Sequence, residues 1–218
     1  MSELLEISNL YFSYDEKKVL NNVGFKLREK EILCIMGKNG SGKTTLFKVL
    51  SGIYDCRNCK VKISGKKASS TDLKKKIMFI PSAPYLYSEL TGMENIELIR
   101  NLWNVDKERY YNRIYKYIAE YGMESFVNDF VKNYSLGMKY KLYYIATISV
   151  GQDIILMDEP LSAMDCESQD KAIADLKEYV ETGKRAIVFS SHISQLISDL
   201  SSKQLLLENG KIQEVMEK

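Results

Sequence analysis

The sequence lacks any long hydrophobic run and carries little net charge. Its apolar runs, such as 32–36 and 154–157, extend over roughly four or five residues, whereas a membrane-spanning helix needs about 20. A formal net charge of only +2 gives no sign of the concentrated basic surface that nucleic acid requires. The opening residues also lack the basic and then apolar plan of a secretory signal. We therefore expect a cytoplasmic protein that has no membrane span and binds no nucleic acid.

The sequence has only four cysteines, and only one pair of them has the spacing of a metal-binding or redox motif. Cys56 and Cys59 have the spacing of a redox motif or half a zinc site, but Cys34 and Cys166 supply no matching partner pair. We interpret Cys56 and Cys59 as part of an ordinary loop between a helix and a strand, with all four thiols reduced in the cytoplasm. The composition, 45% apolar and 28% charged, is typical of a folded domain. The length predicts a single domain over residues 1–218.

Four short runs of apolar and β-branched residues predict buried strands. They cover residues 32–36, 77–80, 154–157 and 186–189, and long amphipathic stretches separate them. Continuous rather than alternating apolarity is typical of strands that are covered on both faces, as in a parallel sheet between helices. The predicted fold class is therefore α/β with a mainly parallel sheet.

Both ends of the chain carry patterns of antiparallel strands. Residues 4–14 and 19–27 alternate apolar and polar side chains around a turn at 15–18, which predicts a small antiparallel β subdomain. Near the other end, the strand-like residues 205–207 and Ile212 flank an Asn-Gly turn, which predicts a hairpin.

The middle of the chain has a helical pattern over about 85–150. Thr91 and Glu94 have the spacing of a capping box at a helix start. Gly122 follows an apolar-periodic stretch, where a helix end is expected. We therefore predict a helical insert in this region.

Residues 37–45 match the phosphate-loop pattern of a glycine, four residues and then Gly-Lys-Thr. The loop lies between the predicted strand 32–36 and a helix-compatible stretch, so its amides would converge at a helix N-terminus. Glycines let the backbone curl around phosphate oxygens, and the amide dipoles stabilise the negative charge. Lys43 is expected to reach the β- and γ-phosphates, and Thr44 to ligate Mg²⁺. The predicted ATP contacts of this loop are Gly37, Asn39, Gly40, Ser41, Gly42, Lys43, Thr44 and Thr45.

Two carboxylates and the only histidine also follow predicted strands. Asp158 and Glu159 come directly after the run 154–157, and His192 follows the next predicted strand through two serines. Functional side chains of α/β folds gather at the carboxyl ends of strands. Asp158 can hold Mg²⁺, directly or through water, and Glu159 can orient and deprotonate the attacking water. A lone histidine is usually a surface or core residue, but its position at a strand end places His192 with this site.

In chain order, these motifs resemble those of ATP-binding-cassette ATPases over essentially the whole sequence. Besides the phosphate loop and the acidic pair, the resemblance rests on Tyr134-Ser135-Leu136-Gly137-Met138, Leu161-Ser-Ala-Met-Asp165 and Ser-Ser-His192. It implies a P-loop NTPase core, an ATP and Mg²⁺ site, and a dimer with a second nucleotide-binding subunit. It further implies that Ser135 and Gly137 face the γ-phosphate held by the opposite subunit. Asp165 would couple the two sites, and His192 would contact the γ-phosphate and hold Glu159 in place.

Simpler structural interpretations are also open for Tyr14 and Ser135. The resemblance implies that Tyr14 stacks on adenine; a half-buried strand tyrosine is the alternative, and Tyr11 is the other candidate for the stacking role. Ser135 precedes a helix-compatible stretch at 136–148, where its hydroxyl and the next amides could present a positive helix end to an anion. A simple N-cap serine would have the same local conformation without any second subunit.

The sequence departs from the family at two places. After the strand 77–80 the family usually has a glutamine that reaches Mg²⁺ and the attacking water, but here Ser82 follows Pro81. A serine is shorter, so either Ser82 acts on the metal only through an intervening water or coupling rests on neighbouring residues, and slow turnover is expected. The signature region also has Leu136 in place of the commonest glycine, and Tyr140-Lys141 in place of glutamine-arginine.

We expect an active ATPase subunit on the inner face of the membrane that powers a separate transmembrane permease. The length and motif style resemble small exporter cassettes. The alternatives are a cassette ATPase that is not coupled to transport and a degenerate regulatory subunit that binds ATP with little hydrolysis.

Overall fold

The computed structural model describes residues 2–56, 59–159 and 161–215, which form two compact units. Within these ranges, the first unit covers residues 2–56, 59–81, 153–159 and 173–215, and the second covers residues 82–152 and 161–172. The predicted helical insert, about 85–150, lies within the second unit.

An antiparallel sheet in the first unit contains the N-terminal strands. Its strand order is β2-β1-β4-β5, with bounds β1 Glu3–Tyr14, β2 Lys17–Arg28, β4 Lys60–Ile63 and β5 Lys66–Lys67. Buried and exposed residues alternate along the second half of β2, which confirms the half-exposed strands expected from the sequence. The turn between β1 and β2 is shorter than predicted, because Asp15 adopts a left-handed backbone with φ of 48° and β2 resumes at Lys17.

A six-stranded sheet in the same unit contains all four predicted buried runs. Its order is β10-β9-β3-β8-β7-β6, with bounds β3 Ile32–Met36, β6 Ile77–Ile80, β7 Ile154–Asp158, β8 Ala186–Ser190, β9 Lys203–Glu208 and β10 Lys211–Glu214. All neighbouring strands are parallel except β9 and β10, which form the predicted hairpin. Asn209 and Gly210 turn it with φ of 49° and 72°, as a tight Asn-Gly turn requires. The predicted α/β class is confirmed.

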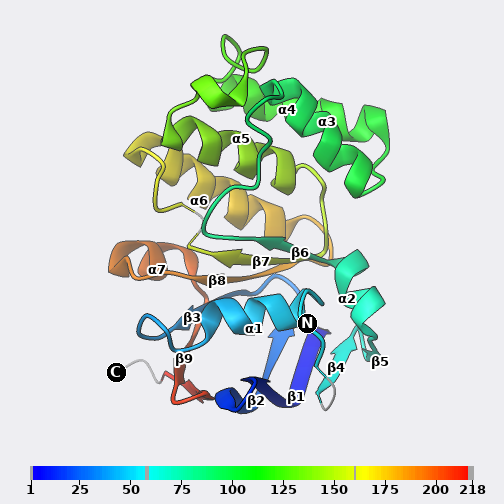
Figure 1. Ribbon diagram of the computed structural model, residues 1–218, viewed down its shortest axis with the longest axis vertical. Coiled ribbons are helices and arrows are strands. Elements are labelled where there is room, and N and C mark those ends of the chain that lie inside the picture. The colour runs from blue at the N-terminus through cyan, green and yellow to red at the C-terminus, as the bar shows by residue number, and fades with distance from the viewer. Residues whose placement is uncertain (1, 57–58, 160, 216–218) are drawn as a thin grey trace. The chain divides into compact units, whose positions relative to one another are not determined.

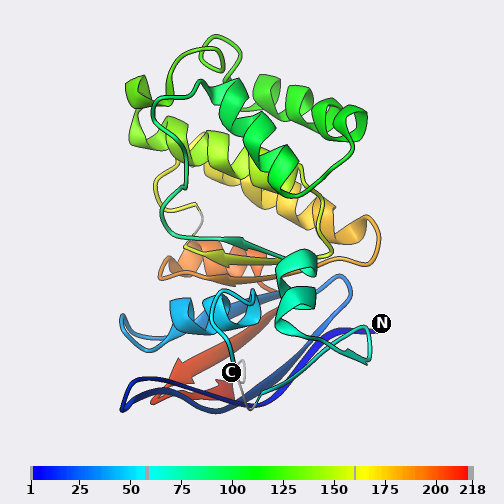
Figure 2. The same cartoon turned by 45° about the vertical axis from the view of Figure 1, so that its right-hand side comes forward.

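Helix α1, Lys43–Leu50, lies between the two sheets (Figures 1 and 2). Leu46, Phe47, Val49 and Leu50 belong to one core cluster that also contains side chains from both sheets. Because this helix is buried, its N-terminus is fixed at the carboxyl end of β3. Helices α2, Ser70–Lys76, and α7, Ser194–Leu200, complete the unit.

The second unit is helical. It contains α3 Gly92–Leu102, α4 Lys107–Glu120, the short 3-10 helix η1 Val131–Asn133, α5 Leu136–Ile148 and the start of α6 Cys166–Glu181, whose remainder belongs to the first unit. The capping box is present: Thr91 Oγ1 accepts the Glu94 amide at 3.2 Å, and the Glu94 carboxylate accepts the Thr91 amide at 2.7 Å. Gly122 follows α4 with φ of 63°. None of the helices in the described part of the chain is long and apolar enough to cross a bilayer.

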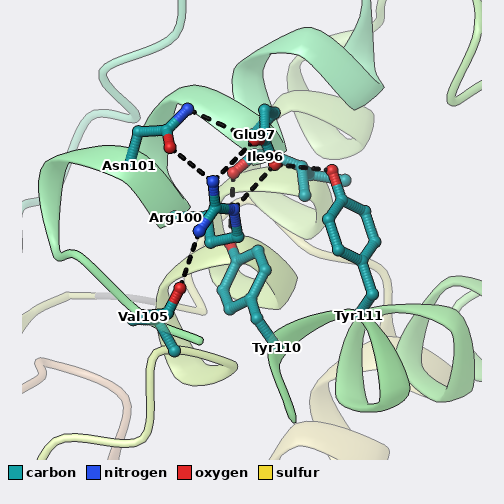
Figure 3. Close-up of polar contacts among 7 residues, drawn as sticks. All are labelled: Ile96, Glu97, Arg100, Asn101, Val105, Tyr110 and Tyr111. Atoms are coloured by element: carbon teal, nitrogen blue, oxygen red, sulfur yellow. Dashed lines mark hydrogen bonds and ion pairs between the residues drawn. The ribbon is translucent and has the colours of Figure 1, made fainter. Parts of the chain in front are cut away.

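A polar network joins α3 to α4 within the second unit (Figure 3). Arg100 donates to both carboxylate oxygens of Glu97, at 2.9 and 2.8 Å, and Tyr111 donates to the same carboxylate at 2.8 Å. The Arg100 hydrogen bond lowers the pKa of Glu97 to about 2. Buried Tyr110 donates to the carbonyl oxygen of Ala146 in α5 at 2.8 Å. The last of these bonds ties α4 to the C-terminal part of α5.

Candidate active site

The loop between β3 and α1 needs glycine at two positions. A Cβ at Gly37, whose φ is 153°, would lie 2.5 Å from the carbonyl oxygen of Leu207. A Cβ at Gly42, whose φ is 107°, would lie 2.9 Å from Val19 Cγ1. A side chain at either position would push the loop away from β9 or β2. Tight packing behind the loop therefore fixes the backbone that leads into α1.

Lys43 lies in the curve of this loop. Its side chain is almost fully buried, and its Nζ donates to the carbonyl oxygens of Gly37 at 2.7 Å and Lys38 at 3.3 Å. The Oγ of Ser41 is buried and has no hydrogen-bond partner among the described residues. Beside Gly40, an added Cβ would meet nothing within 4 Å. A buried cation, a spare hydroxyl and open space at a helix N-terminus fit the phosphates of a nucleotide.

Asp158, the last residue of β7, contacts the first turn of α1 and the end of β8. It is almost fully buried, and its two oxygens accept separate hydroxyls: Oδ2 from Thr44 at 2.5 Å and Oδ1 from Ser190 at 2.6 Å. Thr44 is in the first turn of α1, and Ser190 ends β8. The predicted metal residues Thr44 and Asp158 are thus in direct contact, and they offer the hard oxygen donors that Mg²⁺ prefers.

Glu159 has an unusual backbone that is held by β8. Its φ is 50°, a left-handed value that costs a residue with a side chain on the order of 1 kcal/mol or more. Its amide donates to the carbonyl oxygen of Ser190 at 3.1 Å and lies 3.2 Å from Ser190 Oγ. This turn directs the Glu159 carboxylate to His192, whose Nε2 lies 3.0 Å from Glu159 Oε1. The structure therefore brings both predicted residues together, with part of each side chain exposed.

Tyr14 ends β1 beside the first turn of α1. Its hydroxyl lies 3.2 Å from Thr45 Oγ1, and its ring meets Phe12 and Tyr54 edge-on at 5.1 and 5.8 Å. Burial raises the pKa of the Tyr14 hydroxyl. Tyr14 is still 42% exposed, so a ring surface remains for a ligand. Tyr11 is exposed to a similar degree but makes none of the described ring contacts.

The remaining predicted residues belong to the second unit. Ser135 caps α5, because its Oγ accepts the Met138 amide at 3.2 Å. A Cβ on Gly137 would lie 3.3 Å from the carbonyl oxygen of Ala163. The Asp165 carboxylate accepts the Ser168 amide at 2.9 Å at the start of α6.

Two further contacts in the second unit involve the positions that depart from the family pattern. Lys141 Nζ lies 2.7 Å from Asp165 Oδ2, and this contact lowers the pKa of Asp165 below its usual range. The hydroxyl of Tyr140 donates to the carbonyl oxygen of Ser82. Ser82 therefore lies beside α5 through its backbone, while its own side chain is exposed.

The roles of Ser190 and Gln169 were not predicted from the sequence. Ser190 appeared only as a spacer before His192, although a serine at the end of a buried strand is a signal for a polar contact there. The Gln169 amide donates to the carbonyl oxygens of Leu161 and Met164, each at 3.0 Å, and so fixes the loop that ends at Asp165. No group of three acidic, histidine or cysteine side chains within the described ranges could hold a metal. A cation at Asp158 would therefore share its coordination with hydroxyl, water or phosphate oxygens.

A model of the family described as ABC transporter matches residues 20–162. SkfA peptide export ATP-binding protein SkfE of Bacillus subtilis (strain 168) is 27% identical over 210 residues, which are 96% of this chain and 87% of that protein. Lantibiotic transport ATP-binding protein SrtF of Streptococcus pyogenes is 28% identical over 212 residues, covering 96% and 89%.

A solved structure described as the ATP binding subunit of an ABC transporter superposes with a TM-score of 0.89. It is 25% identical to this chain, and the match covers 97% of this chain and 90% of that one. A nucleotide-free ATP-binding cassette, 20% identical with a TM-score of 0.81, shares the fold. The family match spans more than half of the sequence and includes both the phosphate loop and the acidic pair. The chain belongs to the ABC transporter family, as an ATP-binding subunit whose ATP hydrolysis drives transport.

Proposed function

We propose that this subunit pairs with a second nucleotide-binding subunit and powers export through a separate membrane-embedded permease. The names of the relatives SkfE and SrtF, which refer to peptide export and lantibiotic transport, support an exporter. The pairing is supported by the resemblance of Ser135, Gly137 and Asp165 to residues that, in ATP-binding-cassette ATPases, act on the nucleotide of the opposite subunit. In this proposal the chain is held at the inner face of the membrane by its permease.

ATP binding would begin with three groups of the first unit. The loop amides from Gly37 to Thr45 would surround the phosphates, and Lys43 would exchange its two carbonyl partners for β- and γ-phosphate oxygens. The exposed ring of Tyr14 would stack on adenine. Thr44 and Asp158 would hold Mg²⁺, which, when bound, supplies positive charge to the phosphate oxygens.

Glu159 is the proposed base for hydrolysis. Its carboxylate would accept a proton from water as the water oxygen bonds to the γ-phosphorus and the bond to the leaving oxygen of ADP breaks. His192, 3.0 Å from Glu159, would fix the orientation of that carboxylate and lie close to the γ-phosphate. The left-handed backbone of Glu159 keeps its side chain on the side of His192.

The second unit would complete the site of the partner subunit. Ser135 and the following amides form the positive end of α5, a suitable partner for a γ-phosphate. Asp165 would reach the opposite subunit from the loop that Gln169 and Lys141 hold. Ser82 would contribute to the metal site through a water molecule, because its side chain is too short for direct contact.

The contact between Thr44 and Asp158 is the observation that carries this proposal, because it joins the phosphate loop to the acidic pair. The test is Glu159→Gln, which keeps the shape of the side chain and removes the base. We expect ATP binding within about twofold of wild type and a loss of turnover of about 10² to 10⁴. Single-turnover hydrolysis and size-exclusion chromatography with Mg-ATP would measure both, and the ATP-bound variant should accumulate as a dimer.

Glu178→Gln is the matched control, since Glu178 is exposed on α6. It should hydrolyse ATP at the wild-type rate. Equal turnover in Glu159→Gln and wild type would refute the role of Glu159. Tight ATP binding with no hydrolysis above background in wild type would instead identify a regulatory subunit.

A further inference from the structure

Cys56 and Cys59 lie together beside the antiparallel sheet, although the proposed ATP chemistry uses neither. Cys59 Sγ lies 3.3 Å from the carbonyl oxygen of Cys56, and Cys56 Sγ lies 3.6 Å from the carbonyl oxygen of Tyr11. Both side chains pack against the core of the first unit and remain partly exposed. Residues 57 and 58 between them lie outside the described residues. The two thiols are therefore held on the same part of the core.

The pair differs chemically from the two other cysteines. A hydrogen bond with the Cys56 side chain, together with burial, raises the pKa of the Cys59 thiol. The raised pKa keeps the proton on Cys59, so we assign the attacking role to Cys56. Cys34 is fully buried in β3, and burial raises its pKa to about 12. Cys166 is exposed at the start of α6 and belongs to the second unit.

The pair is also close to the proposed adenine contact. Tyr54, two residues before Cys56, stacks on Phe12 at 5.4 Å and meets Tyr14 edge-on at 5.8 Å. Cys56 itself contacts the carbonyl group of Tyr11, three residues before Tyr14 on β1. A cavity of about 180 Å³ is lined by Tyr54 and both cysteines, so a small reagent can approach the sulfurs. A change at the thiols would therefore act on the strand and the ring that support Tyr14.

We infer that Cys56 and Cys59 form a reversible disulfide, and that this disulfide weakens ATP binding by displacing Tyr54 and the β1 backbone at Tyr11 from the positions that support Tyr14. The first half depends only on the two thiols. The second half rests on the proposed stacking of adenine on Tyr14.

The oxidant is a low-molecular-weight disulfide such as oxidised glutathione. The Cys56 thiolate attacks one sulfur of that disulfide, forms a mixed disulfide and releases one small thiolate. Cys59 then loses its proton to the medium and attacks the Cys56 sulfur, which forms the protein disulfide and releases the second small thiol. The protein loses two hydrogen atoms, and the small disulfide is reduced to two thiols. Neither cysteine retains a thiol proton, so the contacts with the carbonyl groups of Tyr11 and Cys56 are lost.

The first experiment detects the bond by incubating the full chain with oxidised and reduced glutathione and digesting it with trypsin without reduction. Trypsin cuts after Lys48, Arg57 and Lys60, so only a disulfide can join peptide 49–57 to peptide 58–60. We expect this joined peptide in oxidised samples and its loss after reduction. Cys166→Ser should give the same product, and Cys56→Ser should not. Oxidation that yields only glutathione adducts, or only chains linked through Cys166, would overturn the proposal.

The second experiment measures the affinity of the same samples for a fluorescent ATP analogue. We expect oxidation to weaken binding about fivefold, the lower end of typical coupling between two sites, and reduction to restore it. Cys56→Ser, which lacks the thiol that attacks the oxidant, should have the same affinity with and without oxidant. A fully formed disulfide with unchanged affinity would overturn the coupling to Tyr14. Absence of ATP binding in the reduced protein would instead contradict the proposed function and leave the peptide result standing.

Discussion

Ser190 holds Asp158 from the neighbouring strand: its hydroxyl donates to Asp158 Oδ1 over 2.6 Å, and neither side chain is appreciably exposed. The other oxygen of Asp158 accepts Thr44 at 2.5 Å. Ser190 also supplies the carbonyl oxygen that accepts the Glu159 amide at 3.1 Å. One residue at the end of β8 therefore orients both members of the acidic pair, and it ties them to the strand that leads to His192.

Ser190→Ala should destabilise the protein and slow hydrolysis. It leaves one oxygen of a buried carboxylate without its donor, which costs about 1–3 kcal/mol of unfolding free energy. The freed carboxylate can also rotate away from Thr44, so we expect turnover to fall by about tenfold at limiting Mg²⁺ and less at saturating Mg²⁺. Chemical denaturation and steady-state rates against Mg²⁺ concentration would measure the two effects.

Ser191→Ala is the control for this substitution. Ser191 is also buried, but its Oγ accepts the amide of Ile193 at 3.0 Å and has no described hydrogen bond to Asp158. It should lower stability without changing the Mg²⁺ dependence. Equal Mg²⁺ dependence in Ser190→Ala and wild type would show that Ser190 does not position Asp158.

Tyr14→Ala should weaken ATP binding. An aromatic side chain stacked on a base contributes about 1–3 kcal/mol, which corresponds to a loss of affinity of about 5- to 150-fold. Tyr14→Phe keeps the ring and removes only the hydroxyl, with its contacts to Thr45 and Tyr54, so it should bind ATP within about threefold of wild type. Titration with a fluorescent ATP analogue would compare the two variants.

Tyr11→Ala distinguishes the two tyrosines that the sequence left open. Tyr11 is 48% exposed and makes none of the described ring contacts, so its loss should leave ATP affinity unchanged. The reverse result, with Tyr11→Ala weak and Tyr14→Ala normal, would assign the stacking to Tyr11.

The sequence predicted the elements whose signal is local. The run 77–80 and the helix 136–148 have the same bounds in the structure, because a continuous apolar run and an N-cap serine are both visible in a few neighbouring residues. Strand β5 was not predicted, since it has only two residues, Lys66–Lys67, and exists because β4 offers a hydrogen-bonding edge. Such a strand depends on its partner rather than on its own composition.

The contacts of the site could be predicted from the sequence only in part. The strand ends at Asp158 and His192 could be placed from buried runs, because parallel strands bring their carboxyl ends to one edge of a sheet. The hydrogen bond from Ser190 to Asp158 could not, since it depends on β7 and β8 being neighbours in register. The left-handed conformation of Glu159 was also hidden, because glutamate has no preference for it.

The ion pair between Lys141 and Asp165 should stabilise the second unit modestly. Its nitrogen-oxygen distance is 2.7 Å, but the Asp165 side chain is 55% exposed, so solvent screening limits the pair to about 0.2–1 kcal/mol. A double-mutant cycle with Lys141→Met and Asp165→Asn would measure it, since asparagine keeps the cap on the Ser168 amide. A coupling energy of zero would show that the pair does not hold the loop.

The stabilisation from the ion pair between Lys141 and Asp165 should decrease at low pH. The hydrogen bond from Lys141 lowers the pKa of Asp165 in the folded state relative to the usual value of about 3.9. The stabilisation is therefore present above about pH 4 and is lost as pH falls toward the lowered value. The difference in unfolding free energy between wild type and Asp165→Asn should be constant near neutrality and shrink in acid. A difference that grows below pH 4 would contradict this assignment.

Ser82→Gln should raise the rate of hydrolysis. Ser82 is exposed, and its carbonyl oxygen already accepts the Tyr140 hydroxyl, so a longer side chain there does not disturb a buried group. A glutamine carboxamide is long enough to bind both Mg²⁺ and the attacking water directly, whereas serine would need an intervening water. If better positioning of the attacking water lowers the barrier by up to about 1.4 kcal/mol, turnover rises by up to about tenfold. Steady-state ATPase rates would measure the gain, with Ser88→Gln, another exposed serine in the same loop, as the control. Unchanged or slower turnover in Ser82→Gln, at wild-type ATP affinity, would mean that the serine does not limit hydrolysis.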